Sequence, residues 1–249
     1  MRQMHPILKV NRWLSMRFER LFPQSWRESG ASGTGFVDSY LIPGMIVADV
    51  GGGKKPFFSA QEKMRLNLTY IGIDIDPEEL ELAPDGVYDD AWVVNLERPP
   101  GRRLATIDLI ICRNTLEHVQ DARAALEGLY ALLKPGGVCV ITSPCRHAMF
   151  AKLNKTLPQQ LKRNLLQTIF PGKAGDGFIV YYDRASPTEY SKIIQSLGGT
   201  IIEIRKFYWS SYFSVFVPAY VLWRLLTICQ RLLIAGYCEN FQIAFRRNP

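Results

Sequence analysis

Short apolar runs alternate with amphipathic stretches along much of the chain. Two of the amphipathic stretches, Phe57–Arg65 and Asp121–Leu133, show the apolar spacing of helices, and Pro77 stands where a helix can begin. Strands that alternate with helices in this way predict a parallel sheet with helices on both faces. The predicted strands of this part are Met45–Val50, 68–76, 91–96, 107–112 and 138–144.

A long basic segment at 146–185 interrupts the alternation, and we interpret it as a lid-like insertion. The pattern Ser186-Pro187-Thr188-Glu189 then predicts a capped helix start, and this helix ends at Gly198-Gly199. Residues 200–209 and 240–247 are predicted to be the last two strands.

An apolar segment, 208–238, separates these two strands, and no charged residue lies between Lys206 and Arg224. A single membrane span needs about 20 predominantly apolar residues, and Pro218 and several serines interrupt this one. We therefore interpret 208–238 as an apolar insertion with three alternative roles. It lies in a membrane surface, covers an apolar substrate pocket, or forms a dimer interface.

The first residues, 1–30, carry six basic and two acidic side chains. Within them, apolar side chains recur at helical spacing while basic ones occupy much of the other face, which predicts a basic amphipathic helix over 7–22. Its alternatives are a helix that packs on the domain with its bases solvated and a helix that lies on a membrane. The apolar positions are Ile7, Val10, Leu14, Phe18 and Leu21.

Charge is distributed unevenly around a net value of +7. Residues 146–184 carry seven bases and two acids, whereas Asp74–Glu97 holds nine acids and no base. This pattern indicates a pocket for a cationic ligand and a surface for an anionic partner, whether lipid, phosphate or nucleic acid. The five cysteines form no CxxC pair, and no secretory signal opens the chain. We expect free thiols in a cytoplasmic protein.

The stretch "VADVGGGKKPFF", from Val47 to Phe58, places a glycine turn directly after the first strand. Glycine lets the backbone turn tightly and lets its N–H groups approach a ligand. Asp74 follows 23 residues after Gly51, at the end of the second strand, where a carboxylate can accept hydrogen bonds from both ribose hydroxyls. Such a ligand carries a ribose without a 2′-phosphate, which leaves a nicotinamide cofactor or S-adenosylmethionine.

Further motifs separate these two ligands. Together, "YIGIDIDPEEL", "IDLIICRNTLEHVQDARAALEGLYALLKPGG" and "VCVITSP" resemble the class I S-adenosylmethionine-dependent methyltransferases, most closely the branch with ubiquinone-biosynthesis and small-molecule enzymes. The resemblance covers about 36–145 and continues more weakly through 186–209 and 240–247. It implies an α/β fold, a Rossmann-like three-layer sandwich whose seven-stranded, mostly parallel sheet has an antiparallel last strand. It also implies a methyltransferase domain over 31–249, with insertions at 146–185 and 208–238.

By position, the resemblance implies that Asp49 holds the methionine amine and Asp74 the ribose, while Asn95 contacts the adenine amino group. The glycines pass under the methionine part, and Lys55 departs from the family because many members have a third glycine there. We expect Lys54 and Lys55 to face solvent or pair with acids, with contact to a substrate phosphate as the alternative. The implied cofactor site comprises Asp49, Gly51, Gly52, Gly53, Asp74, Ile75, Asn95, Leu96 and Arg113.

His118 is the candidate catalytic residue, because a general base assists methyl transfer to a hydroxyl. Glu117 and His118 match metal ligands of the ubiquinone O-methyltransferases, but Asn114 replaces an acid, so we expect no metal. The alternative is that both side chains only cap the following helix. Weaker candidates are His147, Tyr181 and Tyr182.

The sequence therefore predicts an S-adenosylmethionine-dependent methyltransferase. We expect O-methylation of a lipid-linked, quinone-like or saccharide acceptor at a membrane surface, with the protein peripheral on the inner face. The alternative is a membrane-associated binding or scaffold protein that has the fold and no transfer activity. Pro56 stands where the dinucleotide motif G-x-G-x-x-G has its last glycine, which disfavours an NAD-dependent enzyme. The chain has no Asn-Pro-Pro-Tyr type motif, so we expect no nucleic-acid partner.

Overall fold

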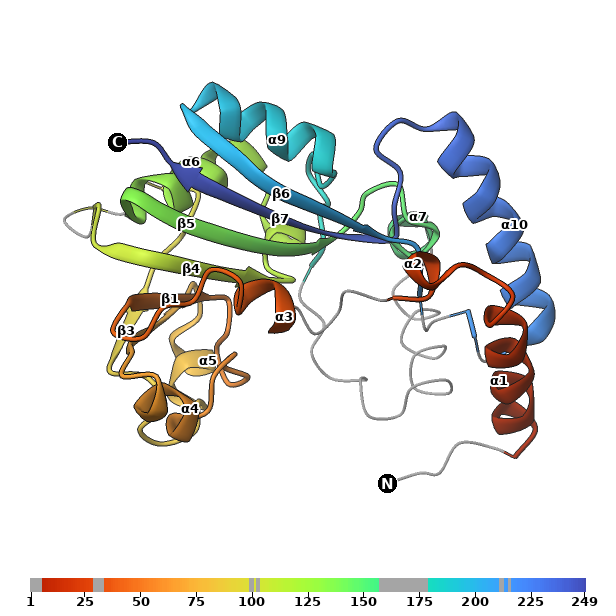
Figure 1. Ribbon diagram of the computed structural model, residues 1–249, viewed down its shortest axis with the longest axis horizontal. Helices are drawn as coiled ribbons and strands as arrows, with labels where there is room; N and C mark the ends of the chain where they lie inside the picture. The colour runs from red at the N-terminus through yellow and green to blue at the C-terminus, as the bar shows by residue number, and fades with distance from the viewer. Residues whose placement is uncertain are drawn as a thin grey trace.

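A seven-stranded sheet in the order β3-β2-β1-β4-β5-β7-β6 forms the centre of the computed structural model (Figure 1). The structure describes residues 6–28, 34–98, 101, 104–156, 179–210, 213–214 and 216–249. The strands are β1 (Ile46–Val50), β2 (Thr69–Asp74), β3 (Asp90–Val93), β4 (Ile107–Arg113), β5 (Leu133–Pro144), β6 (Gly199–Phe207) and β7 (Asn240–Arg247).

The pairing confirms the predicted sheet. β1 pairs in parallel with β2 and β4, β2 with β3, and β4 with β5, whereas β7 runs antiparallel to both β5 and β6. Because β1 lies between β2 and β4, strands β2 and β3 extend the sheet to one side of β1, and strands β4 to β7 extend it to the other. Ligands of such sheets bind outside the carboxyl ends of the strands at the reversal, which here is the end of β1.

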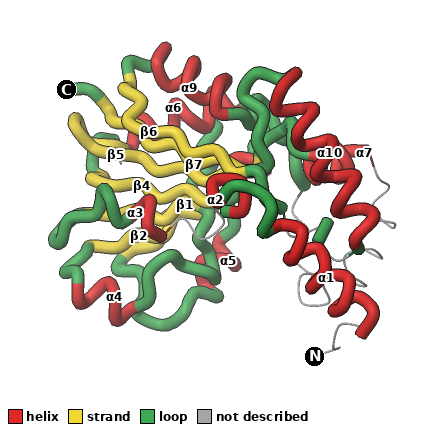
Figure 2. Tube along the Cα trace, turned by 45° about the vertical axis from the view of Figure 1, so that its right-hand side comes forward, coloured by secondary structure: helices red, strands yellow, loops and turns green. Residues whose placement is uncertain are grey.

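Alternate side chains of β1 enter two separate cores. Ala48 and Val50 pack on the face covered by α6 (Ala122–Leu132) and α9 (Pro187–Ser196), and Val47 packs on the opposite face. There α3 (Thr34–Val37) contributes Phe36, and the segment before α4 (Ala60–Arg65) contributes Phe58. Figure 2 shows α6 and α9 on one side of the sheet and α3 and α4 on the other. The predicted three layers are therefore confirmed.

Several element boundaries differ from the predicted ones for local reasons. α4 begins at Ala60 because Ser59 and Glu62 form a reciprocal capping box. β3 ends at Val93, since the Asn95 side chain then accepts a hydrogen bond from the Glu97 N–H (2.9 Å) and turns the chain. β5 already starts at Leu133, which pairs with Ile107 ahead of a register shift. The Lys134-Pro-Gly-Gly segment thus belongs to the strand and not to a loop.

Two helices far apart in the sequence lie side by side beyond the carboxyl edge of the sheet, α1 (Pro6–Glu19) and α10 (Val217–Leu233) (Figures 1 and 2). α10 lies between β6 and β7, inside the predicted apolar segment. No helix among the described residues is both long and apolar enough to cross a membrane. Most of the predicted lid, 157–178, lies outside the described residues. The other helices of the described residues are α2 (Gln24–Arg27), α5 (Pro77–Glu81), α7 (Met149–Thr156) and the 3₁₀ turn η1 (Leu116–His118).

Candidate functional site

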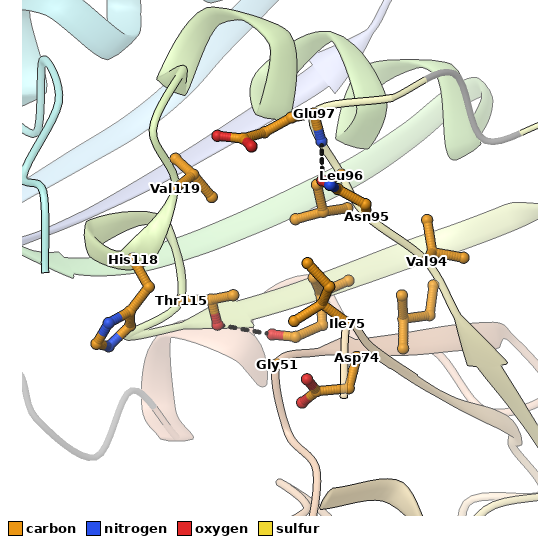
Figure 3. Close-up of a pocket in the computed structure, with 12 residues that line it drawn as sticks. Gly51, Asp74, Ile75, Val94, Asn95, Leu96, Glu97, Thr115, His118 and Val119 are labelled. Carbon is orange, nitrogen blue, oxygen red and sulfur yellow. Dashed lines mark hydrogen bonds between the residues drawn. The ribbon is translucent and has the colours of Figure 1, made fainter. Parts of the chain in front are cut away.

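A pocket of about 490 Å³, partly open to solvent, lies at the carboxyl ends of β1, β2 and β4 (Figure 3). Six of the predicted site residues line it: Gly51, Asp74, Ile75, Asn95, Leu96 and His118. The other lining residues are Val50, Ile73, Val94, Glu97, Thr115 and Val119. Four predicted site residues do not line the pocket: Gly52 and Gly53 of the glycine turn, and Asp49 and Arg113 next to it.

Two residues of the glycine turn have backbone conformations that favour glycine. Gly51 has φ +72° and Gly53 has φ +43°, a region that other residues rarely adopt. The Gly51 N–H donates to the Ile73 carbonyl (2.7 Å), which brings the turn against the end of β2. A side chain at Gly51 would collide with Thr115, whose hydroxyl donates to the Val50 carbonyl (3.0 Å; Figure 3). The turn therefore leaves no room for a side chain between β1 and β4.

Asp49 lies fully buried beneath this turn. Its Oδ2 accepts hydrogen bonds from the Tyr70 hydroxyl (2.5 Å) and the Phe57 N–H (2.7 Å), which fixes both ends of the turn. Burial raises the pKa of Asp49, against the opposing effect of the Tyr70 hydrogen bond. The other carboxylate oxygen, Oδ1, is buried and has no hydrogen-bond partner in the described part of the chain. An ammonium group or a water at the turn would satisfy it.

Asp74 ends β2 and lies against the turn from the other side. A Cβ at Gly53 would come within 3.2 Å of Asp74 Oδ2, so glycine allows the close approach of backbone and carboxylate. Oδ1 accepts from the Asp76 N–H (3.1 Å), and each oxygen keeps lone pairs for further donors. Burial is the largest cause that raises the pKa of Asp74. The neighbouring Ile75 exposes 61% of its surface and offers an apolar wall.

Asn95, Leu96 and Glu97 form the opposite wall. Leu96 is buried, and Asn95 points its amide oxygen at the Glu97 N–H, as the dashed line in Figure 3 shows. Glu97 has a role that the sequence analysis did not assign. Its carboxylate accepts from the N–H groups of Gln120 (2.5 Å) and Asp121 (2.7 Å), so it holds the start of α6 next to the pocket.

The side chains that follow the turn also find partners. Lys54 Nζ lies 2.9 Å from Glu79 Oε1, which confirms the prediction of acid pairing for this lysine. The Arg113 guanidinium lies 4.7 Å from the centre of the Phe57 ring and donates to the Lys55 carbonyl (3.4 Å). Arg113 therefore braces the turn from the β4 side.

His118 closes the pocket at the end of η1. Its Nδ1 lies 2.8 Å from the Ile179 carbonyl oxygen, an acceptor, so Nδ1 carries the proton and the basic lone pair is on Nε2. Glu117 is buried, and its backbone carbonyl accepts from the N–H groups of Tyr181 (2.8 Å) and Tyr182 (3.1 Å). The end of the predicted lid is thus fastened to the pocket wall.

The weaker candidates lie elsewhere. Tyr182 is buried in the core, Tyr181 accepts a hydrogen bond from the Gln120 amide (3.1 Å), and neither lines the pocket. His147 does not line it either, and burial lowers its pKa. Within the described ranges, no group of three or more His, Cys, Asp or Glu side chains is placed to hold a metal ion.

Sequence reasoning missed the residues that support the site from a distance. Tyr70 is the second residue of β2, and its hydroxyl donates a hydrogen bond to Asp49, while Tyr88 donates to the Gly53 carbonyl (3.2 Å). Both read as core aromatic residues in the sequence. Val94, Thr115 and Val119 also line the pocket. The one sequence signal for them was their position at or after the ends of predicted strands, where ligands of parallel sheets bind.

Comparison with known proteins agrees with this geometry. The model of a family described as "Methyltransferase domain" matches residues 20–177, more than half of the chain. Phosphoethanolamine N-methyltransferase 3 of Arabidopsis thaliana is 31% identical over 144 residues, covering 53% of this chain and 28% of its own. Ubiquinone biosynthesis O-methyltransferase of Cupriavidus pinatubonensis is 23% identical over 177 residues, covering 69% and 67%. The chain thus spans under a third of the first relative's length.

Among solved structures, geranyl diphosphate C-methyltransferase from Streptomyces coelicolor has the same fold, with a TM-score of 0.56 and 13% identity. The similarity covers 87% of this chain and 75% of that one, which was solved with S-adenosyl-L-homocysteine. The glycine turn, the carboxylate at the end of β2 and the family match lead to one conclusion. The chain belongs to the class I S-adenosylmethionine-dependent methyltransferases.

Proposed function

We propose that this chain transfers a methyl group from S-adenosylmethionine to an oxygen of a lipid-linked, quinone-like or saccharide acceptor at a membrane surface. One observation carries the choice of oxygen: His118 lines the cofactor pocket with its Nδ1 2.8 Å from the Ile179 carbonyl oxygen, so Nε2 is the ring nitrogen that can take up a proton. A hydroxyl acceptor must lose its proton during transfer, and a base in the pocket wall can take it.

The residues present fit this cofactor. Asp74 offers carboxylate oxygens to the ribose hydroxyls, and the apolar side chains of Ile75 and Leu96 flank the space for the adenine. The unsatisfied Asp49 Oδ1 and the N–H groups of the glycine turn suit the methionine part. The acids around the turn also favour a cationic sulfonium over an anionic ligand.

S-adenosylmethionine supplies a methyl group on a positively charged sulfur. In the proposed reaction the acceptor oxygen forms a bond to the methyl carbon, and the carbon–sulfur bond breaks with its electron pair remaining on sulfur. The acceptor proton moves to His118 Nε2. The Ile179 carbonyl holds the ring while this happens, because it accepts the hydrogen bond from Nδ1. The chain contributes alignment first and proton removal second.

The relatives' names cover methyl transfer to nitrogen, oxygen and carbon, so they do not choose among acceptors. The pocket base favours oxygen. The placement of this reaction at the cytoplasmic face of a membrane is also part of this proposal, and the exposed side chains of α1 and α10 support it.

The test is methyl transfer from labelled S-adenosylmethionine into a fractionated cell extract, followed by identification of the labelled product. We expect label in a lipid-extractable or glycan fraction, on oxygen. The His118→Ala variant should lose this labelling, while His147→Ala, outside the pocket, should keep it. Label found on nitrogen or carbon, or full activity in His118→Ala, would contradict the O-methylation proposal.

A further inference from the structure

We infer that α1 and α10 form one docking surface for an anionic lipid bilayer. The inference rests on the proposed function in placing the acceptor at a membrane, and it deepens that function by naming the surface that binds. The contacts between the two helices, their exposed side chains and their charges carry it.

The outer face of α10 is apolar along its whole length of about 25 Å. Leu232 and Leu233 are 81% and 83% exposed, and Leu222 and Leu225 are 59% and 56% exposed. Together with Val221 and Ile228 they recur at helical spacing on one side of the helix. Soluble surfaces carry single exposed apolar residues, whereas a continuous apolar stripe on one helix marks an interaction site.

α1 adds apolar side chains and positive charge to the same lobe (Figures 1 and 2). Trp13 is 56% exposed and Leu21, just after the helix, is 81% exposed. Four bases on α1 and its end are exposed: Lys9, Arg12, Arg17 and Arg20. The acid of this helix, Glu19, is buried, and within the described residues of 6–28 and 216–233 the one exposed acid is Glu28, which follows α2.

A buried ion pair makes the two helices one unit. Glu19 of α1 pairs with Arg224 of α10, and Tyr220 donates to the same carboxylate (2.6 Å). The Asn11 side chain also accepts from the Val217 N–H at the start of α10 (3.2 Å). Because Glu19 and Arg224 pair with each other inside, the side chains that the unit leaves outside are mainly apolar or basic.

The unit lies on the side of the molecule where the pocket opens. β6 runs parallel to β5 and leads into α10, so α10 leaves the carboxyl edge of the sheet. Trp223 donates to Glu239 (3.1 Å) just before β7, and Gln230 accepts from Lys152 of α7 (3.1 Å). A bilayer at α1 and α10 would therefore face the same edge as the cofactor pocket.

Lipid fits this surface better than a second copy of the chain does. Two copies that met at this surface would bring the four exposed bases of each α1 into one interface, and like charges oppose such pairing. An anionic bilayer buries the leucines in its interface and neutralises the bases, the two signals that stable anchoring needs.

The test measures sedimentation of the full chain with vesicles of phosphatidylcholine alone and of phosphatidylcholine with phosphatidylglycerol. We expect binding to the anionic vesicles that weakens with salt. Leu225→Glu and Leu232→Glu should each reduce the partition coefficient roughly tenfold or more. Lys9→Gln and Arg12→Gln should each reduce it about fivefold. Met64→Glu is the matched control, since Met64 is an exposed apolar residue of α4, and it should leave binding unchanged.

Absence of binding to anionic vesicles, or unchanged binding in Leu225→Glu, would overturn the inference. So would a dimer in light scattering that Leu232→Glu dissociates, because a second copy would then occupy the surface. A parallel titration with S-adenosylmethionine separates this inference from the proposed function. Failure of vesicle binding with intact cofactor binding would refute only the docking surface. Vesicle binding without cofactor binding would instead refute the proposed methyltransferase activity.

Discussion

Replacing Arg224 by methionine is expected to disrupt the α1–α10 unit. The Arg224 and Glu19 side chains are each 3% exposed. Arg224 Nε donates to Glu19 (2.9 Å), and its terminal nitrogens donate to the carbonyls of Tyr208 (2.9 Å) and Trp26 (3.2 Å). Burial lowers the pKa of Arg224 to about 10, so its guanidinium is still charged at neutral pH. Removal of one partner leaves a buried carboxylate and costs about 3–5 kcal/mol.

Hydrogen exchange of the α1 and α10 amides measures this loss locally, and urea unfolding measures it globally. We expect protection of these amides to fall roughly a hundredfold or more, since each 1.4 kcal/mol is about tenfold. The double variant Glu19→Gln with Arg224→Met should recover much of it, because no buried charge is left. Lys192→Met breaks the exposed pair with Glu189 and should cost about 0–1 kcal/mol. Equal losses in Arg224→Met and Lys192→Met would refute the reasoning.

Three further changes test the site. Gly51→Ala should abolish cofactor binding in calorimetry, because the new Cβ meets Thr115, whereas Gly86→Ala, at a similar φ of +69° with open space, should retain it. His118→Ala should lower turnover by about 10²–10⁴-fold with little change in cofactor affinity, and equal turnover would leave alignment alone as the mechanism. Burial raises the pKa of Glu117 to about 8 from 4.5, so the folded chain holds this proton more tightly and stability should fall as pH rises from about 4.5 to 8. Glu117→Gln should remove that slope in thermal melts, and an unchanged slope would count against the burial argument.

The fold could be predicted because its signals are local. Each strand of the parallel part is a short apolar run, and the caps at Ser59, Asp76 and Ser186 stand directly before their helices. The roles of Asp74 and Gly51 could also be predicted, because a turn glycine and a strand-end carboxylate at this spacing have few uses other than nucleoside binding.

Contacts between distant residues could not be predicted in the same way. Nothing in the pattern of 7–22 shows that Glu19 pairs with Arg224, since the two lie more than 200 residues apart. Tyr70 looks like any aromatic residue of a buried strand, and only the fold brings its hydroxyl to Asp49. The amphipathic pattern did indicate that α1 has an apolar face, and the uncharged run indicated that the region of α10 is apolar, but neither showed that the two helices form one surface.

The most direct test of the account is a calorimetric titration of the chain with S-adenosylmethionine, beside Asp74→Ala and the control Asp85→Ala, an exposed acid outside the pocket. Two hydrogen bonds to a charged carboxylate contribute about 1.5–3 kcal/mol each. We therefore predict binding by the wild type and Asp85→Ala, with roughly 10²–10⁴-fold weaker binding by Asp74→Ala. No binding by the wild type, or full affinity in Asp74→Ala, would contradict the assignment of this pocket.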